Sequence, residues 1–161
     1  MRISRLTKNQ RKGAVLPIVT VCLVGLLAFV ALAIDIGMLA VARTQCQAAA
    51  DISALASART LNGETGNNYN SARAQALTIA TNNTILTSPI TAAQVTERSI
   101  GVYRYDTTLQ RFLGVFGPNE TTPPTLQTNE GYGAVRVRIM TSQPTYFARV
   151  LGINSMNVGA V

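Results

Sequence analysis

The sequence contains no histidine and no tryptophan, and it has two cysteines among its 161 residues. The lack of histidine removes the commonest general base and the commonest metal ligand of proteins. The few acidic residues are scattered, with no pair spaced for acid–base catalysis. No glycine-rich segment is followed by the lysine that a phosphate-binding loop requires. We therefore expect no enzymatic activity, no cofactor and no bound metal.

The two cysteines, Cys22 and Cys46, are twenty-four residues apart in a region that predicts one continuous helix. At a rise of ~1.5 Å per residue, they lie too far apart for a disulfide, which needs Cα atoms within ~7 Å. The sequence thus contains no disulfide framework. We interpret Cys46 as a small residue packed in a helix; a cross-link to another chain is the alternative.

Positive charge is concentrated at the start of the chain. The net charge is +7, and residues 1–13 hold five basic residues and no acidic residue. A basic tail can bind nucleic acid. Beside an apolar run, however, it has a simpler explanation, because basic segments stay on the cytoplasmic side of a membrane. We therefore expect a cytoplasmic tail over 1–13 and no nucleic-acid partner.

Residues 14–34 form an uncharged, apolar run of twenty-one residues. As a helix this run is ~31 Å long, close to the ~30 Å hydrocarbon core of a bilayer. The run predicts a single transmembrane helix in the lipid bilayer, with residues 35–161 exported. In a bacterium, this corresponds to the inner membrane, with the exported domain in the periplasm or at the cell surface.

A cleaved secretory signal is the alternative, because Ala31-Leu32-Ala33 has the small-x-small form of a cleavage site. Cleavage near Ala33 would release a secreted binding domain. The apolar run, however, is longer than the ~7–15 residues usual for a signal core. The sequence after Ala33 also continues as a good helix former. These features favour a retained anchor, with a helical stalk over 35–61.

The stalk is rich in alanine, and small residues allow a neighbouring helix or sheet to approach closely. Arg43, Gln47 and Asp51 recur every four residues and predict a polar stripe on its surface. This stripe either sets the register of neighbouring subunits or is a solvated helix face.

The remaining sequence predicts a small α+β domain with an antiparallel sheet and short helices. A hairpin is expected where two strand-like segments flank Asp106-Thr107-Thr108. In the strand over 134–141, valine and isoleucine alternate with Arg136 and Arg138, which predicts one apolar and one polar face. The expected elements are a helix over 71–82, a connection over 84–91, strands over 99–105, 110–115, 134–141 and 155–161, and a short helix from Pro144 to Gly152.

Several motifs together resemble the TadG-like (TadE/TadG) proteins of the tight-adherence, or Flp pilus, secretion system. They are Arg11-Lys12-Gly13-Ala14, Asp35-Ile36-Gly37, ARTQCQAAADISALA over 42–56, PTYFARVLGI over 144–153, and a closing strand that ends in Ala-Val. The resemblance spans nearly the whole chain. It implies a membrane-anchored, minor-pilin-like assembly component. Its partners would be other pilus-assembly or pilin-like proteins, with a homo-oligomer as one arrangement.

The sequence departs from this family at two positions. Larger relatives carry a D-x-S-x-S metal site; Asp51-Ile52-Ser53 begins that pattern, but Leu55 breaks it. We therefore predict no metal there. Prepilins of this secretion class are cut after a glycine that is followed, five residues on, by a glutamate. Gly13 fits the glycine, but Ile18 stands at the glutamate position, so Gly13 is a processing candidate that matches half of the motif.

We expect the assembly contacts to involve Asp35, Gly37 and the polar stripe. Asp35 either pairs with a basic residue of a partner or lies at headgroup level at the end of the membrane segment. Tyr146, Phe147 and Leu151 form either a partner-binding patch or, as we expect, the face of a short helix that packs on the sheet. An envelope scaffold unrelated to pili is a further alternative to the pilus function.

Overall fold

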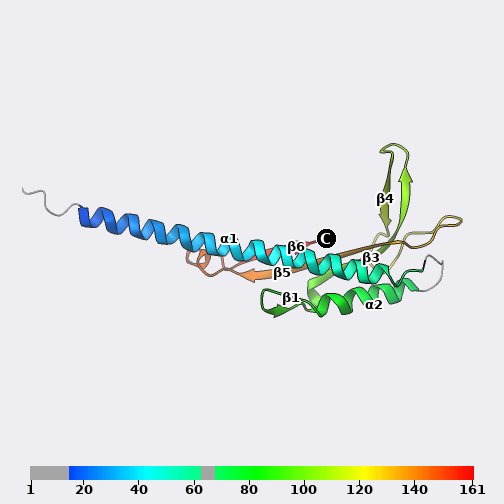
Figure 1. Ribbon diagram of the computed structural model, residues 1–161, viewed down its shortest axis with the longest axis horizontal. Coiled ribbons are helices and arrows are strands. Elements are labelled where there is room, and N and C mark those ends of the chain that lie inside the picture. The colour runs from blue at the N-terminus through cyan, green and yellow to red at the C-terminus, as the bar shows by residue number, and fades with distance from the viewer. Residues whose placement is uncertain (1–14, 63–67) are drawn as a thin grey trace, which may run out of the picture.

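A single long helix organises the molecule. The structure is a computed structural model that describes residues 15–62 and 68–161; the basic tail and Gly13 lie outside the described residues. Helix α1 covers Val15–Ala58, 44 residues, and is therefore ~66 Å long. Its first part extends away from the domain, and its second part packs on the other elements (Figure 1). The predicted helix end near residue 61 is three residues too late.

The other elements form an antiparallel sheet and a second helix, which confirms the predicted α+β class. The four long strands are arranged in the order β4-β3-β5-β6, and every neighbouring pair is antiparallel. In chain order the elements are α2 (Asn68–Thr81), β1 (Thr84–Ile85), β2 (Ser88–Pro89), the 3-10 helix η1 (Ala92–Gln94), β3 (Val95–Asp106), β4 (Arg111–Phe116), β5 (Ala134–Pro144), the 3-10 helix η2 (Ala148–Leu151) and β6 (Ser155–Ala160).

Some predicted boundaries are confirmed and others are wrong. The hairpin around Asp106 is confirmed. The carboxylate of Asp106 accepts hydrogen bonds from the N–H groups of Thr108 and Leu109 at 2.8 and 2.9 Å. Helix α2 begins three residues earlier than expected, and the connection over 84–91 contains the short β1–β2 hairpin. Pro144 does not open a helix: it is the last residue of β5, beyond the part of β5 that pairs with β3, so this end of the strand is an edge, where a missing N–H is tolerated.

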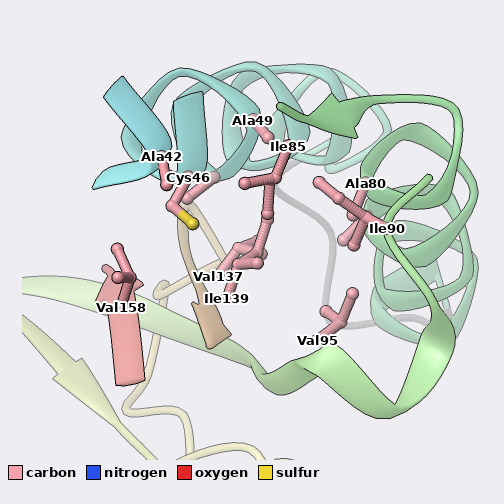
Figure 2. Packing of buried hydrophobic residues seen from close by; sticks show 12 residues of the cluster. Ala42, Cys46, Ala49, Ala80, Ile85, Ile90, Val95, Val137, Ile139 and Val158 are labelled. Atoms are coloured by element: carbon pink, nitrogen blue, oxygen red, sulfur yellow. The ribbon is translucent and has the colours of Figure 1, made fainter. Parts of the chain in front are cut away.

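The core is built mainly from small side chains of the helices and branched side chains of the sheet. The buried face of α1 packs against α2 and against β5 and β6, so the close neighbour that the alanines predicted belongs to the same chain (Figure 2). Cys46 is fully buried there, as expected, and burial raises the pKa of its thiol. The core residues include Ala42, Cys46, Ala49, Ala50, Ala76, Ala80, Ile85, Ile90, Val95, Val137, Ile139 and Val158.

Two side-chain hydrogen bonds fasten α1 to its neighbours. The buried hydroxyl of Ser57 donates to the carbonyl of Ala72 on α2 at 2.6 Å. The side-chain oxygen of Gln45 accepts the N–H of Leu86 in the β1–β2 turn. Leu86 has φ 52°, in the left-handed region, which a leucine adopts at a cost. These bonds position the C-terminal half of α1 as part of the domain.

Candidate membrane anchor and assembly surface

The N-terminal half of α1 presents bare apolar side chains. Within residues 15–62 and 68–161, α1 is the one helix long and apolar enough to cross a bilayer, and none of its most apolar stretch is buried inside the chain. In water this surface would be unfavourable, at ~25 cal/mol for each Å² of apolar area. An exposed apolar patch of this size is typical of a membrane or protein contact.

Asp35 lies at the end of this apolar surface and contacts a distant part of the chain. Asp35 is buried, with 3% of its surface exposed. One carboxylate oxygen accepts the N–H of Tyr146 at 3.0 Å, and the other accepts those of Phe147 at 3.0 Å and Ala148 at 2.6 Å. The first residue of η2 and the two residues before it are therefore bound to α1 by three hydrogen bonds. Hydrogen bonds to an ionised group are stronger than those between neutral groups.

The same hydrogen bonds set the charge state of Asp35. The N–H of Ala148 contributes most to lowering the pKa of the carboxyl below its ordinary value; burial opposes this shift, and the N–H groups of Tyr146 and Phe147 add to it. Because the pKa is depressed, the stabilisation is present at neutral pH and is lost as acid protonates the carboxylate. The sequence alone does not predict this contact, because no local pattern connects residues more than 110 positions apart.

Gly37 and Ala33 lie on the exposed surface of α1. A Cβ at Gly37 would have no neighbouring atom within 4 Å, so packing within this chain does not require a glycine there. Ala33 lies inside an unbroken helix, two residues before the buried Asp35. The roles predicted for both residues stay predictions.

The polar stripe of α1 is partly occupied by contacts within the chain. The amide of Gln47 donates to the carboxylate of Asp51 at 2.9 Å and to the carbonyl of Val161 at 3.3 Å. Arg43 and Asp51 are exposed. Arg43 and Gln47 line a shallow hollow beside β6, together with Arg138 of β5. The structure therefore brings two members of the stripe next to the sheet and leaves charged groups open to solvent.

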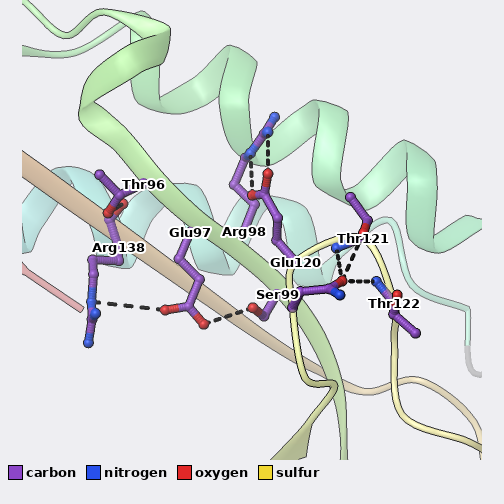
Figure 3. A network of polar contacts seen from close by, with 9 residues as sticks. Thr96, Glu97, Arg98, Ser99, Glu120, Thr121, Thr122 and Arg138 are labelled. Carbon is purple, nitrogen blue, oxygen red and sulfur yellow. Dashed lines mark hydrogen bonds and ion pairs between the residues drawn. The ribbon is translucent and has the colours of Figure 1, made fainter.

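The sheet face opposite the core carries a network of ion pairs. Glu97 accepts hydrogen bonds from Arg136 at 2.7 Å and from Ser99 at 2.8 Å, and Arg138 lies 3.9 Å away. Burial disfavours the charge of Glu97, but these hydrogen bonds and charges outweigh it, so its pKa is lowered. Figure 3 shows the contacts of Glu97 with Ser99 and Arg138. Arg98 pairs with the core residue Val137, so its ion pair with Glu120 lies on the other side of β3. The predicted polar face of the strand is confirmed.

The comparisons with known proteins match both halves of this architecture. A family model named Tad, described as Flp pilus-assembly TadE/G-like, matches residues 13–60. A second model, Tad_C, described as Tad-like Flp pilus-assembly, matches residues 56–161. The chain belongs to the Tad-like Flp pilus-assembly family. This confirms the expected resemblance, and it makes the protein a pilus-assembly component. No curated protein and no solved structure gives a match.

The boundary between the two matches coincides with the end of α1, at Ala58. The first Tad-like unit is therefore the long helix, and the second is α2 with the sheet. In the part of this Tad-like chain that the structure describes, no group of three or more potential ligands is placed to hold a metal ion. Asp51 faces solvent, whereas the hydroxyl of Ser53 donates to the carbonyl of Ala49 at 2.6 Å.

An ion pair between Arg104 of β3 and Glu130 holds the loop between β4 and β5 in this Tad-like domain. Arg104 donates two hydrogen bonds to Glu130, at 2.8 and 2.7 Å, and Gln127 donates its N–H at 2.7 Å. These contacts lower the pKa of Glu130 from its ordinary 4.5 to about 2. The hydrogen bond from Arg104 is the main cause, and the hydrogen bond from Gln127 is the next. The ionised Glu130 therefore stabilises the folded domain fully above pH 4.5, and this stabilisation is lost as the pH falls toward 2.

We expect the backbone amide of Gln127 to shift in an NMR titration with a midpoint near pH 2, well below the ordinary value of 4.5. Protonation of Glu130 removes the acceptor of this amide, and the resonance reports that loss directly. In the Glu130→Gln variant, which cannot ionise, the transition should be absent. A midpoint near the ordinary value would show that the carboxylate is not held by Arg104.

Proposed function

We propose that this Tad-like protein is a membrane-anchored, minor-pilin-like component of Flp pilus assembly. Residues 14–34 would cross the bacterial inner membrane once, with the N-terminus cytoplasmic and residues 35–161 exported. The observation that carries the proposal is the continuity of α1, whose first half is bare and apolar and whose second half forms the core of the domain. The basic tail supports this orientation.

The retained anchor is favoured over cleavage near Ala33 for a structural reason. Ala33 lies within α1, and Asp35 two residues later is bonded to the 146–148 backbone. Helix α1 thus contains both the apolar segment and part of the domain core. No extended linker lies at the cleavage position. An uncut chain would keep the domain at the membrane surface, where pilus-assembly partners gather.

Assembly contacts are proposed for the exposed surface of α1 beyond the bilayer. Arg43 and Asp51 carry opposite charges on this surface, and Gly37 adds no side chain there. Opposite charges on one helix can set the register between subunits. The partners would be other pilus-assembly or pilin-like proteins, or further copies of this chain.

The anchor is tested by intact mass measurement of the protein from carbonate-washed membranes. An uncut or Met-trimmed chain in the membrane pellet supports a permanent anchor. A chain that starts at Ala14 and is recovered with sheared surface fibres would make it a processed subunit, cut after Gly13. A soluble chain that starts at Ile34 would overturn the anchored function and support a secreted binding domain.

Orientation is tested by introducing one additional cysteine at a time and labelling intact spheroplasts with a membrane-impermeant maleimide. Thr107→Cys, at the exposed tip of the β3–β4 hairpin, should react without lysis, because this domain is exported. Ser4→Cys in the basic tail should react after lysis alone. The unsubstituted protein gives the background, which is expected to be low because Cys46 is buried and the exposed Cys22 lies within the proposed membrane span. The reversed labelling pattern would contradict the proposed orientation.

A further inference from the structure

The segment that joins β5 to β6 exposes its apolar side chains. Residues 145–154 read TYFARVLGIN and include η2; we call them the η2 loop. Val150 and Leu151 are 87% and 76% exposed, whereas Ala148 is buried. The expectation that this segment packs on the sheet is therefore wrong. In a water-soluble domain, neighbouring apolar side chains with such exposure would indicate a contact surface.

The η2 loop lies beside the membrane segment of α1 rather than beside the rest of the sheet. Phe147, Val150 and Leu151 form one wall of an apolar groove, and the other wall is α1 between Val24 and Leu32. Figure 1 shows this segment at the end of the β5–β6 pair that points toward the N-terminal half of α1. At ~1.5 Å per residue, the wall on α1 is ~12 Å long, and it lies within the second half of the proposed membrane span.

Most backbone N–H groups of the η2 loop have hydrogen-bond partners within the protein. Irregular backbone is normally excluded from lipid because no water is present there to pair its N–H and C=O groups. Here Asp35 accepts the N–H groups of residues 146–148. Val150, Gly152 and Ile153 donate to carbonyls of the loop itself, and Thr145 bonds to Asn154. Together these bonds pair most of the backbone N–H groups of the η2 loop, which lowers the cost of placing it in a bilayer.

The sequence of the η2 loop fits a shallow position in the membrane. Arg149 is its one charged residue, and an arginine can lay its stem along apolar surface while its head reaches the lipid headgroups. Tyr146 is of the type enriched at membrane interfaces. Lys and Glu, which are costly in lipid, are absent from residues 145–154.

We propose that the η2 loop is a second membrane-inserted element, whose apolar side chains contact lipid acyl chains in the leaflet on the exported side. The occupant of the groove is an acyl chain because both walls lie at the depth of the α1 span. The proposal rests on the proposed membrane anchor. The domain is then attached to the bilayer at two places, α1 and the η2 loop, with Asp35 joining them.

The test uses the absence of tryptophan from the natural chain. Three single-tryptophan variants, Val150→Trp, Leu27→Trp and Leu109→Trp, are reconstituted as full chains in phosphatidylcholine vesicles with brominated acyl chains. All three positions are exposed, so the larger side chain can be accommodated. Leu27→Trp reports on the α1 anchor, and Leu109→Trp on the β3–β4 hairpin, where no quenching is expected.

We expect bromine to quench Val150→Trp to a similar extent as Leu27→Trp, with Leu109→Trp unaffected. If Leu27→Trp is quenched and Val150→Trp behaves like Leu109→Trp, the inserted loop is overturned while the anchor stands. If Leu27→Trp is not quenched, the anchor itself fails, and the loop proposal fails with it. Blue-shifted emission of Val150→Trp without quenching would indicate a protein partner and would also overturn the proposal.

Discussion

Replacing Asp35 by alanine is expected to release the η2 loop from α1 and to lower the melting temperature of the detergent-solubilised protein by ~5 °C. The substitution removes the acceptor of three backbone N–H groups at once. Donors left unpaired in a place with little water are costly. Hydrogen–deuterium exchange followed by mass spectrometry should show amides 146–148 exchanging roughly tenfold faster or more.

The matched control is Asp51→Ala on the same helix. Asp51 is exposed, and its side chain accepts one hydrogen bond from Gln47. Its loss should leave exchange at residues 146–148 and the melting temperature essentially unchanged. Asp35→Asn keeps one acceptor oxygen, so its exchange rate at residues 146–148 and its melting temperature should lie between those of the two alanine variants. Equal behaviour of the Asp35 and Asp51 variants would show that Asp35 does not hold the loop.

Enlarging a core alanine should destabilise the domain strongly, because the helices approach through small side chains. Ala76 on α2 is 0% exposed and shares a cluster with Cys46 and Ala49 of α1. Leucine there adds volume that a close-packed interior cannot accept without displacing α2. We expect Ala76→Leu to reduce the free energy of unfolding by ~1–3 kcal/mol. Urea denaturation of the full chain in micelles, followed by circular dichroism of the sheet and helices, measures this change.

The control for this variant is Ala74→Leu, two residues earlier on the exposed surface of α2. Leucine and alanine have similar helix propensities, and a surface change of this kind usually alters stability by less than about 0.5 kcal/mol. The difference between the two variants therefore isolates the packing of the α1–α2 contact. A loss in Ala74→Leu as large as that in Ala76→Leu would contradict the view that α2 is held through its alanine face.

Local patterns in the sequence predicted the parts of the fold that depend on local physics. The uncharged run over 14–34 and the good helix formers after it predicted α1. Alternation around Arg136 predicted β5 and the orientation of its two faces. The alanines of α1 predicted a close neighbour but not its identity, because a small side chain is equally compatible with a partner protein and with α2 of the same chain.

The candidate site depended on contacts between distant residues, and it was predicted less well. Asp35 was recognised as unusual, but its partners at residues 146–148 are determined by the β5–β6 pairing, which places the η2 loop beside α1. Tyr146, Phe147 and Leu151 were expected to pack on the sheet. An apolar residue that the fold leaves exposed and one that packs on a sheet look alike in a sequence, and the structure shows that these three are exposed.

The unbroken course of α1 has a mechanical consequence. The domain has no hinge between its core and the apolar segment, because the same helix supplies both. A pull on the domain along this axis is therefore transmitted directly to the apolar segment of α1, because no linker lies between them to absorb it. Under the two proposals made above, α1 and the η2 loop would both have to leave the lipid in one step when the subunit is extracted. Extraction would then be an all-or-none event.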